Sequence, residues 1–351
     1  MFKTADDGGI MNVTTSHLSG NTGFPLPESA QKTLLVITAG ALLLWGSPPV
    51  ALLAGIGFAL LIGQPLAGKG HRLSKWLLQF CVVLLGFGMN LPEVLRLGLH
   101  GSLFAAVSIA ATLGLGYWLG KRAGLDRNTS TLISAGTAIC GGSAIAAVSS
   151  VIAASDAEIA VSIGTVFLLN AVALYFFPIA GHLLHLSQGQ FGLWAGIAIH
   201  DISSVVGAGL SYGPDALSTA TAVKLSRTLW IVPLTLALAL HLGQRRRNQP
   251  DDKQEAAPRA KRLKITVPWF IGLFLLASLL RSYVPVIAVW SPDISAVARR
   301  GMVLVLFLIG TSLSVRALRV VGWRTVAVGL ALWLFISAGS LLAICGWHLS
   351  S

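Results

Sequence analysis

Two cations, one histidine and one aspartate stand inside long apolar stretches of this chain. His200 and Asp201 interrupt one stretch, and Lys224 and Arg227 interrupt the next. A charged side chain near the centre of a bilayer costs about 3 kcal/mol or more, so such groups indicate function by default. Lys224 and Arg227 are three residues apart, lie on similar faces of a helix and can attract an anion together. Histidine exchanges protons near neutral pH, so His200 is a candidate for proton coupling, with Asp201 as the second candidate.

Each of these groups also has a structural interpretation. His200 and Asp201 can form a buried pair, and the two cations can extend to the lipid interface or pair with Asp201. Counting inward from Ala216 at about 1.5 Å per residue puts Lys224 and Arg227 near mid-depth, which favours an interior position.

A stretch of small residues from Ala135 to Ala144 adds neutral polar groups. Glycines loosen a helix, and a broken helix in a membrane presents free N–H groups and a positive end to an anion. The alternative is close helix packing through small residues. The candidate substrate-binding groups in this stretch are Thr137, Cys140, Gly141, Gly142 and Ser143.

Three further polar residues lie at comparable depth. Asn170 stands in the middle of its apolar stretch, and Ser203 and Ser204 follow Asp201. The alternative for Asn170 is a hydrogen bond to a neighbouring helix. Four successive stretches place polar groups near one level, which predicts one site, and we add Asn170, Ser203 and Ser204 to its substrate-binding groups.

Composition places these residues in a membrane protein. The chain has 351 residues, 54% hydrophobic and 11% charged, with a mean hydropathy of +0.77, whereas soluble domains carry about 25% charged residues. The net charge of +12 falls mostly in loops, without an aromatic-studded basic face, so we expect no nucleic-acid partner. No CxxC spacing and no Walker-type glycine loop is present, so we expect no metal, no cofactor and no ATP.

The fold class predicted is an all-α polytopic transmembrane bundle. A span needs about 20 apolar residues, fewer when it is short or broken. About eleven segments meet that rule: Thr33–Trp45, Val50–Leu66, Lys75–Met89, Gly101–Leu119, Thr129–Ile152, Glu158–Leu184, Phe191–Ser211, Ala216–Leu242, Ile265–Leu280, Gly301–Leu313 and Thr325–Cys345.

Loop charges predict the orientation in a bacterial inner membrane. Cations gather in alternate connections, and the positive-inside rule then puts the N-terminus in the cytoplasm and the C-terminus outside. We expect a disordered cytoplasmic tail at 1–32, spans 1 to 8 with the site at 33–243, a charged cytoplasmic linker at 244–264 and spans 9 to 11 at 265–351. Cations that run against the rule are Arg96, Arg281, Arg299 and Arg300.

Two internal matches suggest repeats. Gly86 and Gly98 match Gly310 and Gly322 at equal spacing, and the predicted topology gives the two copies opposite orientations, as in the inverted repeats of secondary transporters. Gly-Thr-Ala-Ile from 136, with Ser143, aligns with Gly-Ile-Ala-Ile from 196, with Ser203. The second match suggests two related broken segments framing one site. Chance is the alternative for both.

The chain resembles a family of bacterial membrane proteins of the YeiH type, to which sulfate export is assigned. The resemblance runs from about Leu34 to the C-terminus. It rests on the stretch from Ala135 to Ala144, on His200-Asp201 with Val-Val-Gly from 205, and on Lys-Leu-Ser-Arg from 224. The family often has Glu after the histidine, and Asp201 keeps that charge. The family in turn resembles cation–proton antiporters and bile-acid-type symporters, which implies inverted repeats and broken helices.

These observations favour a secondary transporter that exports a small anion, sulfate or sulfite, coupled to a proton or sodium gradient. We expect no enzyme, although a Cys140–His200 nucleophile and base is one alternative. A channel or a structural membrane subunit is the other. The lipid bilayer is the expected partner, and association into a homo-oligomer is left open.

Overall fold

The computed structural model describes residues 27–63, 69–247, 269–312 and 321–349, and these residues form fourteen helices. The helices are α1 (Glu28–Trp45), α2 (Pro48–Leu61), α3 (Lys69–Gly86), α4 (Leu91–Ala123), α5 (Arg127–Ala138), α6 (Gly142–Ile152), α7 (Asp156–Leu183), α8 (Gln188–Ala198), α9 (Ile202–Tyr212), α10 (Pro214–Leu229), α11 (Ile231–Arg247), α12 (Trp269–Tyr283), α13 (Pro285–Ser312) and α15 (Trp323–Leu349). The all-α prediction is confirmed for the described residues. Most of the predicted tail and linker lies outside them, although α1 begins at Glu28 and α11 continues to Arg247.

Several helices are long and apolar enough to cross a membrane. Four qualify by length and hydropathy among the described residues, and the shorter apolar helices include α1, α2 and α12. The four long ones cover Asp156–Leu183, Pro214–Leu242, Pro285–Thr311 and Trp323–Gly346. The second of them comprises α10 and α11 together.

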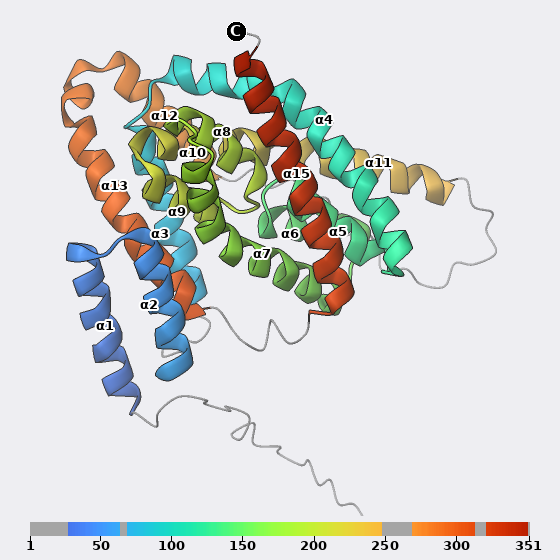
Figure 1. The fold of residues 1–351 in the computed structure, drawn as a ribbon, viewed down its shortest axis with the longest axis horizontal. Coiled ribbons are helices and arrows are strands. Elements are labelled where there is room, and N and C mark those ends of the chain that lie inside the picture. The colour runs from blue at the N-terminus through green and yellow to red at the C-terminus, as the bar shows by residue number, and fades with distance from the viewer. Residues whose placement is uncertain (1–26, 64–68, 248–268, 313–320, 350–351) are drawn as a thin grey trace, which may run out of the picture.

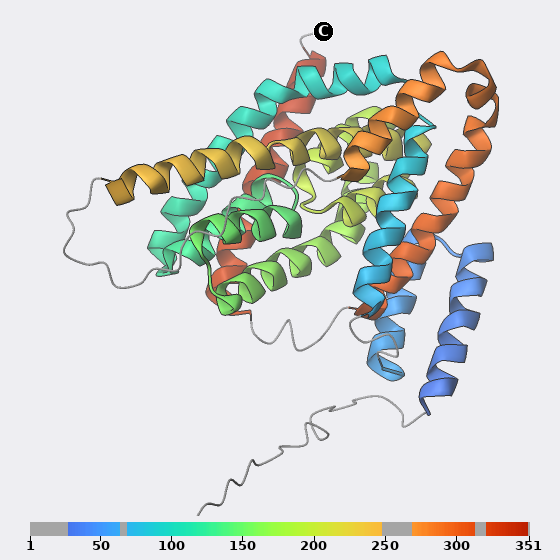
Figure 2. The ribbon, with the colours of Figure 1, turned by 180° about the vertical axis from the view of Figure 1, so that it is seen from behind.

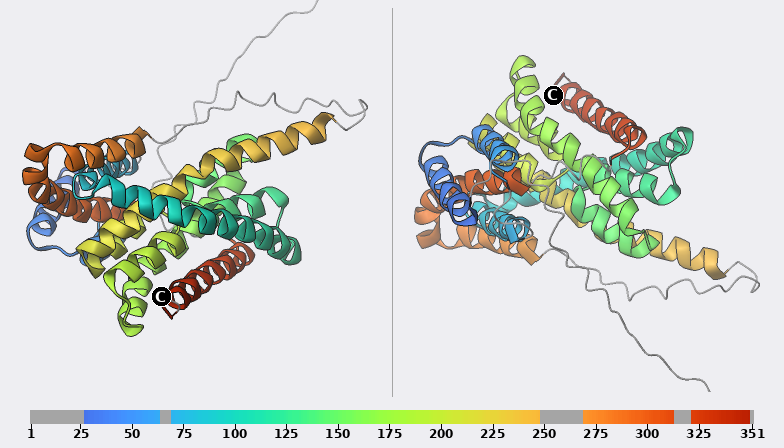
Figure 3. Two further views of the ribbon diagram at one scale, coloured as in Figure 1. Left: turned by 90° about the horizontal axis from the view of Figure 1, so that it is seen from above. Right: turned by 90° about the horizontal axis from the view of Figure 1, so that it is seen from below.

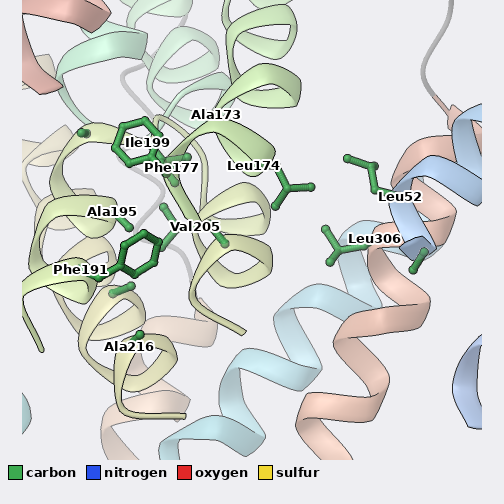
Figure 4. Close-up of a cluster of buried hydrophobic side chains, with 14 of the residues drawn as sticks. Leu52, Ala173, Leu174, Phe177, Phe191, Ala195, Ile199, Val205, Ala216 and Leu306 are labelled. Atoms are coloured by element: carbon green, nitrogen blue, oxygen red, sulfur yellow. The ribbon is translucent and has the colours of Figure 1, made fainter. Parts of the chain in front are cut away.

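The helices fall into two groups. The outer group consists of α1, α2, α3, α12 and α13, which pack mainly on one another; the hairpin group consists of α4 to α11 and α15. The outer group lies at one end of the molecule in every view, and α11 crosses the back of the hairpin group (Figures 1, 2 and 3). Helix α9 contacts α2 and α13 across the boundary. There Leu52 and Leu306 face Leu174 in one apolar cluster (Figure 4).

Helices α5 and α6 fold back on one another and are called hairpin 1. A Cβ built on Gly136 would lie 2.9 Å from Cδ1 of Ile145, so the two arms run side by side. The amide of Asn128 at the start of α5 donates to Glu158, with 3.3 Å between Nδ2 and Oε2. Glu158 stands in the first turn of α7, shortly after α6 ends. The start of α5 and the end of α6 therefore lie at the same end of hairpin 1.

Helices α8 and α9 form a second such unit, hairpin 2. The hydroxyl of Tyr212, the last residue of α9, donates to the carbonyl of Leu186 just before α8, at 2.6 Å. The Tyr212 ring also stacks on Phe191 in α8, with centroids 3.8 Å apart. The N–H of Asp215 donates to Oε1 of Gln188 at 2.9 Å. The chain thus leaves hairpin 2 where it entered.

The prediction of full crossings at Thr129–Ile152 and Phe191–Ser211 was wrong. Each arm has 11 or 12 residues, which is about 16–18 Å at 1.5 Å per residue. Such an arm spans about half of the ~30 Å hydrocarbon core. Apolar length shows how much chain a membrane can hold, but it does not show whether the chain turns back.

The predicted breaks in these two segments are confirmed, and they have the same spacing. Hairpin 1 turns between Ala138 and Gly142, and hairpin 2 turns between Ala198 and Ile202, 60 residues later in both cases. This is the offset at which Gly-Thr-Ala-Ile from 136 matches Gly-Ile-Ala-Ile from 196.

The match between Gly86 and Gly310 places both residues where helices approach closely. A Cβ on Gly86 would lie 2.5 Å from the carbonyl oxygen of Phe274, and one on Gly310 would lie 2.6 Å from that of Leu52. Residues 313–320, which belong to the second copy, lie outside the described residues. The inverted repeat based on this match stays a prediction.

Candidate functional site

The tips of the two hairpins meet beside the middle of α7. A Cβ built on Gly141 would lie 3.2 Å from Cβ of Asp201 and 3.4 Å from Cγ1 of Val166. The backbone N–H of His200 donates to Oδ1 of Asn170 at 3.1 Å. Val166 and Asn170 are about one helical turn apart on α7. Both tips therefore reach the same level of this 28-residue helix.

Two buried cations from α10 bond to the end of the first arm of hairpin 1. Lys224 Nζ donates to the carbonyl of Ile139 at 3.3 Å. Arg227 donates to the carbonyl of Ala138 and, at 3.0 Å, to the hydroxyl of Ser108 in α4. Helix ends leave such carbonyls unpaired and carry a partial negative charge, so both cations stabilise the end of α5.

Burial decides between the interpretations of these cations. Lys224 is 0% and Arg227 2% exposed, so neither extends to the surface of the protein. Asp201 attracts Lys224, but neither cation forms an ion pair with it among the described residues. The direct partners of both cations are carbonyl and hydroxyl oxygens, which the charge pattern alone did not reveal.

Asp201 caps the second arm of hairpin 2. Its Oδ1 accepts from the N–H and the hydroxyl of Ser203, both at 2.5 Å, and its Oδ2 accepts from the hydroxyl of Ser204 at 2.9 Å. A carboxylate at this position satisfies free N–H groups and balances the positive helix end. Asp201, Ser203 and Ser204 thus have a local structural role at the tip.

The second arm of hairpin 1 begins without such a cap. Gly141 precedes α6 with φ +66°, and no side chain caps the helix. The hydroxyl of Ser143 lies 2.9 Å from the sulfur of Cys140, and Ser143 is exposed. Gly142 lies between Gly141 and Ser143. A Cβ built on Gly142 would lie 3.6 Å from Phe167, which is an ordinary contact distance. The positive end of α6 is therefore the open helix end at this tip.

Several buried polar atoms around the tips have no hydrogen-bond partner among the described residues. A buried group left unpaired costs about 1–3 kcal/mol, so each of them could bind a ligand atom. They are Oγ1 of Thr137, Nδ2 of Asn170, Nδ1 and Nε2 of His200, and Nε of Arg227. Because His200 makes no ring hydrogen bond, the nucleophile–base bond of a Cys140–His200 enzyme is not formed in this structure.

All the predicted site residues lie on the two tips, the middle of α7 and the facing part of α10. The structure brings them together but divides them by role. Lys224, Arg227 and Asp201 hold helix ends. His200, Asn170 and Thr137 keep free polar atoms, and Arg227 keeps a free Nε besides its bonds. Sequence reasoning missed Ser108, whose only signal is a hydroxyl inside an apolar stretch.

Comparison with known proteins supports the membrane assignment. Residues 39–329 match the family described as Conserved hypothetical protein 698. A UPF0324 membrane protein of Porphyromonas gingivalis is 48% identical over 305 residues, which cover 86% of this chain and 87% of the relative. The chain belongs to this family. It is therefore a multi-pass membrane protein of the UPF0324 family.

Other UPF0324 relatives match over a similar length. The protein of Bacteroides thetaiotaomicron is 45% identical over 86% of this chain and 87% of its own. That of Bdellovibrio bacteriovorus is 44% identical, over 86% and 90%. No solved structure matches this chain. The names of these UPF0324 proteins state a membrane protein and no substrate, so the sulfate assignment stays a prediction.

Proposed function

We propose that this UPF0324 protein is a secondary transporter that exports a small anion, sulfate or sulfite, coupled to an ion gradient. The observation that carries the proposal is the meeting of two hairpin tips beside two buried cations. Broken or re-entrant backbone at membrane depth persists only where protein or water satisfies it, and transporters build their sites from such half-helix ends.

The local charges favour an anion. Lys224 and Arg227 bring two positive charges to the tips, and Asp201 brings one negative charge. The uncapped N-terminus of α6 adds a further positive end. Free N–H groups at a helix N-terminus bind anions directly. In this proposal the anion lies against α6 near Ser143, and the two cations supply the positive potential behind it.

The path of the chain supports alternating access. The two hairpins open at opposite ends of α7, so each would approach the middle of the membrane from a different face. A site between their tips can be reached from one side by moving one hairpin and from the other side by moving its counterpart. A rigid motion of the hairpin group against the outer group is the second way to expose it.

Orientation in the inner membrane follows the same proposal. With two hairpins in place of two crossings, the C-terminal ends of α2, α4, α11 and α13, next to which the cations gather in the sequence, still fall on one side. The positive-inside rule then keeps the N-terminus in the cytoplasm and the C-terminus outside. Only the connections 153–155 and 184–187 change sides.

Flux of labelled sulfate or sulfite into proteoliposomes under imposed pH and sodium gradients tests the function. We expect gradient-dependent accumulation by the wild type and a reduction of at least about tenfold in Lys224→Met. Lys224→Arg, which keeps the charge and the donors, is the matched variant and should retain more flux.

Three outcomes would contradict the proposal. Equal flux in wild type and Lys224→Met would refute the role of the cation. Flux that never accumulates against a gradient would indicate a channel. Absence of flux for every anion in a panel would favour a structural subunit.

A further inference from the structure

The imidazole of His200 is the least satisfied buried group at the tips. His200 is 1% exposed, and neither Nδ1 nor Nε2 has a hydrogen-bond partner among the described residues. Its charged neighbours differ in this respect, since Asp201, Lys224 and Arg227 all bond to oxygen or nitrogen atoms of the protein. Buried polar groups are nearly always paired, so a free imidazole at this place calls for an incoming partner.

Asp201 is a poor carrier for a proton by comparison. Its carboxylate already accepts three hydrogen bonds from Ser203 and Ser204 at the start of α9. Protonation would weaken these bonds and remove the negative charge from a positive helix end. Of the two neighbouring candidates, only the imidazole has ring nitrogens free to take up and release a proton.

The surroundings of His200 make its charge dependent on an anion. Burial of the ring and the charge of Lys224 both disfavour a positive charge on the imidazole. The other charged or titratable groups at the tips are Asp201, Arg227 and the Cys140 thiol, and α7 contributes only the neutral Asn170. A bound anion would offset the repulsion by Lys224. His200 also lies two residues after Ala198, the last residue of α8, and positive charge is favoured at such a helix end.

We propose that His200 binds the coupling proton, and that the proton and the anion bind cooperatively at the hairpin tips. The inference rests on the proposed anion transport and specifies its coupling. One proton from water would add to a ring nitrogen as the anion enters, and it would leave the same nitrogen as the anion departs. By linkage, each ligand strengthens the binding of the other by the same factor.

Binding of radiolabelled sulfate to the purified full-length protein, measured between about pH 5 and pH 8, tests this coupling. The wild type should bind sulfate more tightly as the pH falls, by up to about tenfold per pH unit for one linked proton. In weakly buffered solution, sulfate should drive the uptake of about one proton per chain. His200→Gln should lose both the pH slope and the proton uptake.

Two variants serve as controls. Asp201→Asn keeps a good helix cap but removes the carboxylate, so it should keep the pH slope. His241→Gln changes an exposed histidine on α11 and should behave as the wild type.

The outcomes separate the two proposals. Saturable sulfate binding that does not change with pH would overturn the coupling inference and leave anion transport standing. If the pH slope were lost in Asp201→Asn but kept in His200→Gln, Asp201 and not His200 would be the residue that binds the coupling proton. Wild type that neither binds nor transports sulfate, sulfite or any other anion of a panel would overturn the proposed function and the inference with it.

Discussion

Hairpin 1 and hairpin 2 have the same construction but use their helix ends in opposite ways. Both turn at bounds 60 residues apart, and both place their tips beside the centre of α7. In hairpin 1 the end of the first arm is bonded by Lys224 and Arg227, and the start of the second arm has no side-chain cap. In hairpin 2 the start of the second arm is capped by Asp201. No cation bonds to the end of its first arm among the described residues.

The two hairpins therefore leave opposite charges unbalanced. Hairpin 1 keeps a positive helix end open, and hairpin 2 keeps a negative one open. An anion suits the first, and a proton on His200 suits the second. Two copies of one supersecondary unit can thus supply the two halves of a coupled site by differing in a few charged residues.

The opposed entry of the hairpins gives the largest expected effect. With Cys345→Ser as background, Gly189→Cys at hairpin 2 should react with a membrane-impermeant thiol reagent added outside the cell. Ala157→Cys, in the first turn of α7 just after hairpin 1, should react only after permeabilisation. A topology of eleven full crossings predicts the reverse pattern at both positions. That result would refute the hairpin topology.

Removing a buried cation at hairpin 1 should lower the stability of the protein more than removing the Asp201 cap at the tip of hairpin 2. Arg227→Met leaves the carbonyl of Ala138 unpaired, and a buried unpaired group costs about 1–3 kcal/mol. It also removes the donor to the hydroxyl of Ser108, which keeps its bond to the carbonyl of Ala105. Asp201→Ala removes a helix cap and should cost about 1 kcal/mol. Thermal unfolding in detergent measures both. An equal or larger loss for Asp201→Ala would contradict the asymmetry.

Adding a methyl group at the tip of hairpin 1 should cause an intermediate loss of stability. Gly141 has φ +66° and ψ −126°, a conformation that other residues adopt only under strain of about 1–3 kcal/mol. Its Cβ would also press on Asp201 at 3.2 Å. Gly141→Ala should therefore lower both stability and flux. Gly142→Ala is the matched control, because its Cβ would meet only Phe167 at 3.6 Å; similar losses in the two variants would refute this account.

The smallest effect is expected where hairpin 1 begins, at the N-terminus of α5 and away from the tip. Asp126 accepts the N–H of Thr129 at 2.7 Å and caps α5. Partial burial alone would raise the pKa of Asp126, but hydrogen bonds, chiefly from Thr129, hold it below its ordinary value. The stabilisation is therefore present above the ordinary aspartate range and is lost as the pH falls through the lowered pKa.

Asp126→Ala should cost about 1 kcal/mol at neutral pH, and Asp126→Asn should cost less. Thermal unfolding at neutral and acidic pH measures the difference. An Asp126→Ala penalty that stays constant in acid would show that the carboxylate charge is not responsible.

Sequence reasoning located the breaks but not the direction of the chain after them. Gly141 and Gly142, with the match between 136 and 196, indicated two related interruptions, and polar residues at one depth indicated one site. Whether an arm continues or returns depends on contacts such as Tyr212 to Leu186, which no hydropathy pattern encodes. The partners of Lys224 and Arg227 were missed for a similar reason. Main-chain carbonyls lack a partner within the helix only where the helix ends.

The bonds from Lys224 and Arg227 to the end of α5 also bear on the medium in which hairpin 1 can stay folded. A dissolved metal ion bound to these carbonyls would leave as its concentration fell. A tethered ammonium and a tethered guanidinium cannot diffuse away, and in a buried position they are little screened by salt. Because both cations are part of the chain, we expect the tip of hairpin 1 to keep its shape when the external salt concentration changes.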